Sequence, residues 1–224
     1  MAAALRRVSQ QEVCLVDFSA ASGQAALHLR LQPRTSWLDL PTEDGALSWP
    51  VVKDRLLVHP SGLRVLAAPA VPQDPSYLTA DLTRSLLTLL QKNTSFTIID
   101  LPNAYTSAFR TAMEMADMGL HVLNPDVVSV QTAVQLNRHL VKQNINVAQR
   151  SHVLNQTAAD AQLPLAMVEK GLGARIPFQI PYDPNQARAL TQGVPLALTP
   201  AKTPIGLITQ RMAEVIIQRV ASSK

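Results

Sequence analysis

Short apolar runs recur along the chain and are separated by stretches with a helical period. The six runs, rich in apolar residues at successive positions, are 12–18 (EVCLVDF), 63–68 (LRVLAA), 96–101 (FTIIDL), 120–124 (LHVLN), 151–155 (SHVLN) and 176–180 (IPFQI). Apolar residues at successive rather than alternating positions are typical of strands buried on both faces of a parallel sheet. We therefore predict strands in these six ranges.

The stretches between these runs carry apolar residues every three or four positions, which predicts helices. The predicted helices cover 79–92, 105–118, 127–143 and 205–220, with a short one near 47–57. Thr79 is a suitable cap for the first of them, and Asp81 suits its first turn. Strand and helix alternate over the whole length without a Gly/Ser linker or a repeat. This alternation predicts a layered α/β fold with a mostly parallel sheet, formed by residues 1–224 as one domain.

The amino-acid composition and the net charge argue against several classes of protein. Charged residues make up only 16% of the chain, against roughly 25% in average proteins, which argues against charge-driven disorder. Aromatic residues are scarce at 4%, so a base-stacking surface is not expected. The net charge of +4 is spread without a block of like charges, so a nucleic-acid partner is not favoured. No apolar run approaches the ~18 residues of a membrane span.

The single cysteine, Cys14, falls inside a predicted strand. One cysteine excludes an intramolecular disulfide framework, and its place in an apolar run predicts a core residue rather than a nucleophile. The five histidines form no pair with metal-ligand spacing, so a histidine metal site is not expected. Together these features favour a cytoplasmic location.

Polar residues follow the predicted strands, where the ligands of parallel α/β proteins bind. They are Asp17, Ser19, Asp100, Asn124, Asp126, Asn155 and Asp183, and Pro181 follows the last strand beside Asp183. Two acids at neighbouring strand ends suit Mg²⁺, which binds through few carboxylates and several waters. An asparagine amide both donates and accepts, as recognition of an adenine edge requires. The competing interpretation is that a strand-end Asp only caps the next helix, and the pattern leaves both open.

Five segments carry a resemblance to a known family. They are VCLVDFSAASGQAALHLRLQPRTSWLDL, HPSGLRVLAAPAVP, FTIIDLP, VLNQ and IPYDPNQARALTQGVPL. In this order they resemble the ParA/MinD superfamily of P-loop ATPases with a deviant Walker motif. Within it they are most similar to the CpaE/TadZ branch, which is linked to assembly of Flp-type (type IVb) pili. The resemblance covers about residues 3–220 and implies a three-layer, doubly wound P-loop NTPase fold of the SIMIBI type.

The resemblance also implies roles for individual residues. Asp100 corresponds to the Walker B-like acid that holds Mg²⁺ through water, and Asp17 to an acid near the Mg²⁺ and the γ-phosphate. Asn155 corresponds to the residue that recognises adenine, and Pro181 and Asp183 lie in the loop that closes over the base. The implied cofactors of a full-length parent are therefore ATP and Mg²⁺.

Two departures from the family pattern weaken the expectation of ATP hydrolysis. Ser19 stands where the family has a second acid that positions the attacking water, and a hydroxyl has neither the charge nor the basicity of a carboxylate. No G-x-x-x-x-G-K motif followed by Ser or Thr, nor its deviant form, occurs in the 224 residues. Without that loop the triphosphate lacks its backbone N–H cradle and lysine.

The family's phosphate loop precedes its first helix, and residues 2–7 (AAALRR) resemble the end of that helix. We therefore expect an N-terminally truncated ATPase domain in which the first strand and the phosphate loop are absent. That strand is central in the family, so two inner strands are expected to have unpaired edges. Tight ATP binding is not expected from this chain alone.

The resemblance implies a spatial role, in positioning or assembling a pilus or a related secretion machine through nucleotide-linked dimerisation. The expected partners are a second copy or proteins of that machinery, at the cytoplasmic side of the inner membrane or the cell pole. The amphipathic stretch 205–220 matches the family's ordinary last helix, so membrane docking is not favoured. Two other functions stay open: a non-catalytic protein-interaction module, and a DNA-partitioning ATPase.

Overall fold

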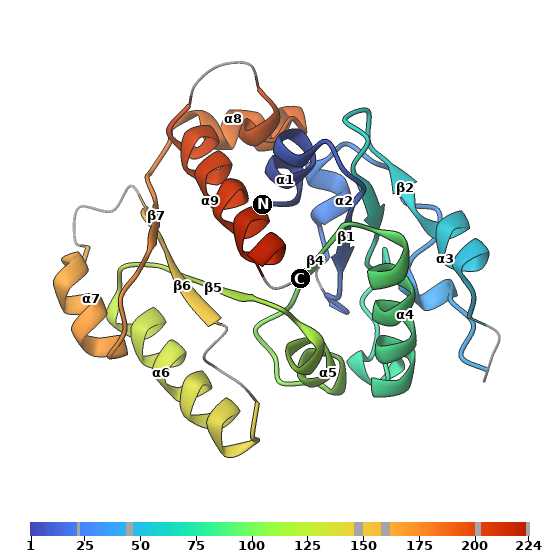
Figure 1. Cartoon of the computed structure of the whole chain (residues 1–224), viewed down its shortest axis with the longest axis horizontal. Coiled ribbons are helices and arrows are strands. Elements are labelled where there is room, and N and C mark those ends of the chain that lie inside the picture. Colours follow the sequence, from blue (N-terminus) through green and yellow to red (C-terminus); the bar gives the residue numbers. More distant parts are fainter. Residues whose placement is uncertain (22, 44–46, 146–149, 158–161, 200–202, 223–224) are drawn as a thin grey trace.

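The strands of the computed structural model form two separate sheets (Figure 1). The model describes all residues except 22, 44–46, 146–149, 158–161, 200–202 and 223–224. The first sheet has the order β2-β3-β1-β4 and the second has the order β5-β6-β7. Their bounds are β1 Val13–Asp17, β2 Leu57–Val58, β3 Arg64–Leu66, β4 Phe96–Asp100, β5 Gly119–Leu123, β6 Arg150–Asn155 and β7 Phe178–Ile180.

All strand pairs are parallel except that of β2 with β3. The six predicted strands correspond to β1, β3, β4, β5, β6 and β7, with ends that differ by up to two residues. The prediction missed β2 because two residues are too few to show a period. The fold is therefore a mostly parallel α/β fold, as predicted, but its sheet is divided in two.

Helices connect the strands, and the predicted helices are confirmed with small shifts of their ends. The α-helices are α1 Ala2–Ser9, α2 Ala25–His28, α3 Trp49–Arg55, α4 Ala80–Asn93, α5 Ser107–Met115, α6 Val127–Lys142, α7 Leu165–Leu172, α8 Asn185–Gln192 and α9 Pro204–Ser222. Short 3₁₀ helices are η1 Trp37–Asp39, η2 Pro75–Tyr77 and η3 Leu196–Leu198. The Thr79 hydroxyl accepts a hydrogen bond from the Leu82 amide at 3.2 Å, so Thr79 caps α4 as predicted. None of the described helices is long and apolar enough to cross a membrane.

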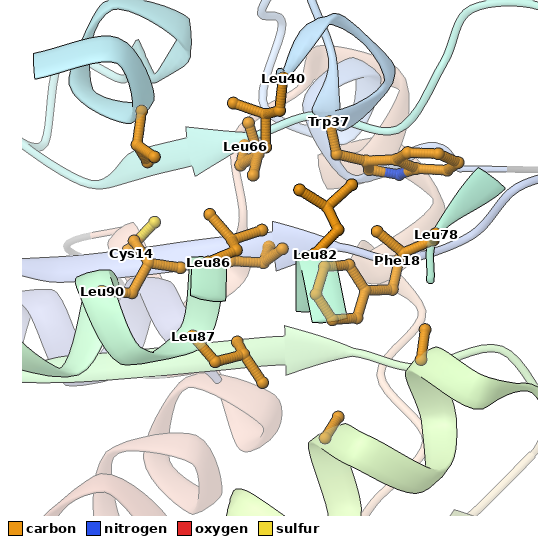
Figure 2. Packing of buried hydrophobic residues seen from close by; sticks show 14 of the residues in the cluster. Cys14, Phe18, Trp37, Leu40, Leu66, Leu78, Leu82, Leu86, Leu87 and Leu90 are labelled. Carbon is orange, nitrogen blue, oxygen red and sulfur yellow. The ribbon is translucent and has the colours of Figure 1, made fainter. Parts of the chain in front are cut away.

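The first sheet is buried on both faces by helices, which makes this half three-layered. On one face Cys14 and Leu66 pack against Leu86 and Leu90 of α4 (Figure 2). On the other face, Val13 belongs to a cluster with residues of α1 and α9. Adjacent residues of β1 thus face opposite layers, which explains the continuous apolar run. Cys14 is fully buried, and burial raises the pKa of its thiol to about 12, so the prediction of a core cysteine is confirmed.

The second sheet has the same layers, and one helix joins it to the first. On one face Leu154 packs with residues of α6 and α7. On the other, Val153 and Phe178 pack against Met212 of α9. Ile216 of the same helix belongs to the cluster beneath the first sheet. Helix α9 therefore packs under both halves of the molecule.

The two sheets meet across a cavity of about 1850 Å³. It is lined along the whole of β4 and along residues 119–122 of β5. Among the described residues, strand β4 pairs only with β1, and β5 pairs only with β6, so each leaves one edge without a strand partner there. Helix α5 connects β4 to β5, and such a crossover returns the chain to the starting end, so the two strands run in the same direction. The expected unpaired edges are thus those of β4 and β5. We call this space the inter-sheet cavity.

Candidate functional site

The two acids of the first sheet lie side by side at its carboxyl edge. Asp17 and Asp100 are the last residues of β1 and β4 and are direct partners in the strand register. The amide of Phe18 donates to the carbonyl of Asp100 at 3.0 Å, which ties the two strand ends together. Residues paired in register on neighbouring parallel strands present their side chains to the same face. The structure therefore brings together the two residues expected at a Mg²⁺ site.

Asp17 is held by the backbone that follows it. Its side chain is buried, with 1% of the residue exposed. The Oδ1 atom accepts from the Ser19 amide at 3.0 Å, and Oδ2 accepts from the Ala25 amide at 3.1 Å. A buried carboxylate is tolerated where backbone donors satisfy it. Asp17 therefore organises the turn between β1 and α2 and has a fixed orientation without any ligand.

Gly23 makes this turn possible. A Cβ atom at this position would lie 2.0 Å from the Cβ of Ala68 and 2.9 Å from Oδ2 of Asp17. Any side chain here would displace either the neighbouring loop or the carboxylate. In the sequence, Gly23 stands only within one of the segments that carry the family resemblance, because a close approach across the fold leaves no local signal.

Asp100 lies at the mouth of the inter-sheet cavity and differs from Asp17 in its electrostatics. The cavity leaves its carboxylate accessible. The surrounding protein removes part of its hydration, which raises the pKa of Asp100, and the neighbouring Asp17 raises it further. The α-amino group of Met1 lies in the same region; burial lowers its pKa, and the attraction of Asp100 partly opposes that effect. A cation at this carboxyl edge would relieve the repulsion between the two acids.

The second sheet gathers amide groups at its own carboxyl edge. Asn155 is the last residue of β6, and its Nδ2 atom donates to Oδ1 of Asn124, after β5, at 3.4 Å. Its register partner is Ile180, the last residue of β7. Pro181 and Asp183 follow directly, so the residues expected around a base come from adjacent strand ends.

Asp183 is the most buried of this second group, with 2% of the residue exposed. Its Oδ1 atom accepts from both the backbone amide and the side-chain amide of Asn185, each at 3.0 Å, at the start of α8. Its Oδ2 atom is buried and has no hydrogen-bond partner in the described part of the chain. A buried acceptor without a donor costs free energy, and an exocyclic amine is one group that would satisfy it.

One strand-end acid has the simpler role. The Oδ1 atom of Asp126 accepts from the Ser129 amide at 2.8 Å and caps α6. These hydrogen bonds lower the pKa of Asp126. The capping interpretation is thus correct for Asp126.

The residues present fit some parts of a magnesium nucleotide and not others. Asp100 is open to the cavity and suits a Mg²⁺ bound through water, while Asp17 is already satisfied by two amides. No group of three or more metal-ligating side chains occurs among the described residues, so such an ion would keep most of its waters. Asn155 has the amide that the prediction requires for an adenine edge, whereas Asp183 is buried, with 2% of the residue exposed. The triphosphate has no G-x-x-x-x-G-K cradle within these 224 residues.

No protein-family model matches the sequence, and no curated protein matches it either. The fold, however, is that of the ParA/MinD ATPases. A ParA family ATPase from Chlorobium tepidum superposes with a TM-score of 0.85 at 18% identity, covering 95% of this chain and 89% of that one. The septum site-determining protein MinD of Pyrococcus horikoshii with Mg-ADP gives 0.78 at 16% identity, with coverage of 96% and 86%. MinD in the Aquifex aeolicus MinC:MinD complex gives 0.76 at 21%, with coverage of 97% and 87%.

Proposed function

We propose that this chain is part of a ParA/MinD-related protein of the CpaE/TadZ kind. Its role is to position or assemble a Flp/type IVb pilus or a related secretion machine, with nucleotide binding linked to dimerisation in the full-length parent. The observation that carries the proposal is the pair Asp17 and Asp100, side by side at the carboxyl edge of a ParA/MinD fold. The order of sequence motifs supports the CpaE/TadZ branch.

In this proposal, residues of the first sheet would bind the Mg²⁺ of the nucleotide, and residues of the second sheet would bind its base. Bound Mg²⁺ would neutralise charge on the phosphates of ATP, and Asp100 would hold its water shell. Asp17 keeps the turn after β1 in place through its two backbone hydrogen bonds. Asn155 and the unpartnered oxygen of Asp183 would read the base, with Pro181 in the adjoining loop. Phosphate contacts would come from residues of the parent outside these 224.

ATP binding by the full-length parent tests the nucleotide part of the proposal. The intact mass of the native protein and its N-terminal peptide come first, because they define the parent. Equilibrium dialysis of that parent is expected to show Mg²⁺-dependent ATP binding that Asp100→Asn weakens. Asp126→Asn is the matched control, because Asp126 only caps α6. A parent without affinity for ATP would remove the nucleotide from the proposal.

The positioning role has a separate test in the source cells. A fluorescent fusion of the parent is expected to gather at a pole or another single site. Deletion of the gene is expected to reduce or misplace the pili or the secretion machine. A diffuse fusion together with normal assembly in the deletion strain would contradict the role, whatever the outcome for ATP.

A non-catalytic interaction module is the second candidate. Two sequence features favour it: Ser19 in place of an acid, and the absence of a G-x-x-x-x-G-K motif from the 224 residues. Specific binding of Mg-ATP by the 224-residue chain itself would count against it. A partitioning ATPase has less support, because the net charge is only +4; a salt-dependent DNA shift would favour it.

A further inference from the structure

A second cavity lies beside the amino ends of the strands in the first sheet. It has a volume of about 520 Å³ and is lined by the last turn of α1, by the turn between β2 and β3, and by residues after α8. Helix α1 leads into the start of β1, and the turn leads into the start of β3, which is parallel to β1. Asp17 and Asp100, in contrast, are the last residues of their strands. We call this space the amino-edge cavity, because it lies at the opposite edge of the sheet from those two acids.

Arg6 brings a positive charge to this cavity without an acceptor for it. Its Nε and Nη1 atoms are buried and have no hydrogen-bond partner among the described residues. The turn after β2 lies against the guanidinium group: a Cβ on Gly62 would be 2.7 Å from Nη2 and 2.9 Å from Nε, and the φ angle of 83° at Gly62 also favours glycine. Burying a charge without a partner costs free energy. An anion in the cavity would therefore stabilise Arg6.

Two further donors line the cavity. Arg7 contributes a second guanidinium group, whose Nη2 atom donates to the neutral Oε1 atom of Gln210 at 3.1 Å. Nδ1 of His59 accepts from the amide of Ser61 at 3.1 Å, so the proton of the neutral ring is on Nε2. Burial lowers the pKa of His59, which keeps the ring neutral at pH 7. The cavity thus combines two guanidinium groups with an imidazole N–H.

No acidic side chain of the described residues balances these charges inside the cavity. Its described lining residues are basic, neutral polar or apolar. Neither Arg6 nor Arg7 forms an ion pair with another described residue. The hydrogen bond from Arg64, at 2.6 Å, lowers the pKa of Glu12 most, and the charge of Arg6 contributes less. Glu12, the acid that Arg6 attracts, is therefore already paired with another residue.

Basic residues in the last turn of a helix often only bind its terminal carbonyl groups, which is the competing interpretation of Arg6 and Arg7. Among the described residues, neither guanidinium group donates to a carbonyl of α1. The carbonyls of Leu5 and Arg7 accept instead from the side chains of Ser9 and Gln10, at 2.7 Å each. The end of the helix therefore does not account for the two arginines.

The rest of the cavity wall is apolar. Pro60, Val194 and Leu198 line it, and Val194 is 42% exposed. The volume lies within the range of small-molecule sites, about 300–1,000 Å³, and exceeds that of a bare oxyanion. Charged donors together with apolar surface suit an anionic group that is attached to an organic body.

We propose that the amino-edge cavity binds the phosphoryl group of a small organic phosphate. Such a monoester has a charge of about −1.5 to −2 at pH 7 and three acceptor oxygens. These match two guanidinium groups and an imidazole N–H better than the single charge and two oxygens of a carboxylate. Arg6 and Arg7 would supply the positive charge, and His59 the neutral donor. This site is separate from nucleotide binding, because it uses none of the residues at the carboxyl edges of the two sheets.

An NMR titration of the native protein with phenyl phosphate tests the site. The side-chain N–H signal of Arg6 Nε and the ring signals of His59 are expected to shift with one common, saturable dissociation constant. Phenyl sulfate has the same shape but only one negative charge, so it should bind about tenfold more weakly. Both signals report the amino edge, so their response does not depend on whether ATP binds at the other edge.

A first pair of variants tests the charge of Arg6. Arg6→Gln should weaken the binding of phenyl phosphate about tenfold, because it removes a charge-assisted hydrogen bond. Lys92→Gln is the matched control, because Lys92 is exposed on α4 and does not line the cavity. This control removes the same charge from the same half of the molecule and should leave the dissociation constant unchanged.

A second pair of variants leaves the contact between Arg6 and Gly62 in place. Val194→Glu adds a carboxylate at an exposed position of the cavity wall, where it competes for the two arginines. It should weaken the binding of phenyl phosphate about tenfold. Val194→Gln introduces a side chain of the same shape without the charge and should retain most of the affinity.

Inorganic phosphate distinguishes two sources of the phosphoryl group. Tighter binding of phenyl phosphate supports an organic phosphate, because the apolar wall then contacts the ring. Equal affinities would overturn the organic part and assign the site to free phosphate. Three outcomes would overturn the site itself: no saturable shift at Arg6 and His59, equal binding of phenyl phosphate and phenyl sulfate, or unchanged binding in both Arg6→Gln and Val194→Glu.

Discussion

The buried acids that follow the strands of the two sheets differ in how their oxygens are satisfied. In the first sheet, Asp17 is deeply buried and both of its oxygens accept backbone hydrogen bonds. In the second, buried atoms of His121, Arg150 and Asp183 have no partner among the described residues. Asp17 is therefore held by the backbone around it, whereas Asp183 keeps one acceptor that the described residues do not use. Buried atoms without a partner also occur in the first half, at Trp37 Nε1 and Arg55 Nε, so the contrast concerns these two acids and not every polar group of the halves.

Two leucine truncations give the largest expected effect and test whether the halves are separate cooperative units. Leu86 packs between α4 and the first sheet, and Leu154 lies in the second sheet; they are 0% and 2% exposed. Leu86→Ala and Leu154→Ala should each lower the free energy of unfolding by about 2–5 kcal/mol. Hydrogen exchange should show the loss of protection mainly in the sheet that carries the substitution.

The control is Leu207→Ala, at a position of α9 that is 52% exposed, which should change stability by no more than about 0.5 kcal/mol. Uniform loss of protection in both sheets after either truncation would show that the two halves unfold as one unit. The two halves would then differ in their polar groups but not in their stability towards unfolding.

Filling the space at Gly23 should have the next largest effect, confined to the first half. Gly23→Ala places a Cβ 2.0 Å from that of Ala68, and overpacking of this kind costs about 1–3 kcal/mol. Urea denaturation measures the loss. Gly173→Asn is the matched control, because Gly173 ends α7 with φ of 65°, has open space around it, and asparagine tolerates that conformation. Equal effects of the two substitutions would contradict the importance of close approach at Gly23.

Replacing Asp17 tests how far its charge raises the pKa of Asp100. Asp17→Asn removes one of the two acceptors used by the Ser19 and Ala25 amides, which should cost about 1–3 kcal/mol. It also removes the like charge that helps raise the pKa of Asp100, so that pKa should fall. A ¹³C NMR titration of the Asp100 carboxyl group measures the shift. An unchanged pKa would mean that loss of hydration alone perturbs Asp100.

Periodicity predicted most of this fold, because β1 and the centre of β6 are buried between layers and their sequences show it. The half-buried β4 has the same apolar pattern. The rule that ligands bind beyond strand ends found Asp17 and Asp100 as neighbours. Neither the periodicity nor the strand-end rule predicted the close approach of Gly23 to Ala68. Nor did they predict that one oxygen of Asp183 would have no partner among the described residues. These features depend on contacts between segments far apart in the chain, which local patterns do not encode.

Local patterns also did not predict how the basic side chains of β5 and β6 lie together. His121 and His152 fall in two of the predicted strands, and the structure makes them register partners with ring centroids 5.4 Å apart. The sequence did not indicate that Arg150 would lie across Gly119 beside them. Arg150, His121 and His152 come together only through the pairing of β5 with β6.

The two histidines beside Arg150 lead to the smallest predicted effect, a dependence of the free energy of unfolding on pH. Burial, together with the positive charges of Arg150 and His152, lowers the pKa of His121 to about 4. The unfolded chain has the ordinary pKa of 6.5 and therefore binds more protons than the folded chain between about pH 6.5 and pH 4. Stability should thus fall as the pH decreases through this window. His152, whose pKa is also lowered, acts in the same direction.

His121→Gln should make this fall shallower, because it removes one group that the unfolded chain protonates and the folded chain does not. Urea denaturation at steps between pH 7 and pH 4 measures the slope. Val122→Gln introduces the same side chain at a neighbouring position that is 54% exposed, without removing a titratable group, and should leave the slope unchanged. A slope that survives His121→Gln would mean that carboxylates govern the acid sensitivity. A slope reduced by His121→Gln but not by Val122→Gln would assign part of the acid sensitivity to the buried imidazole of His121.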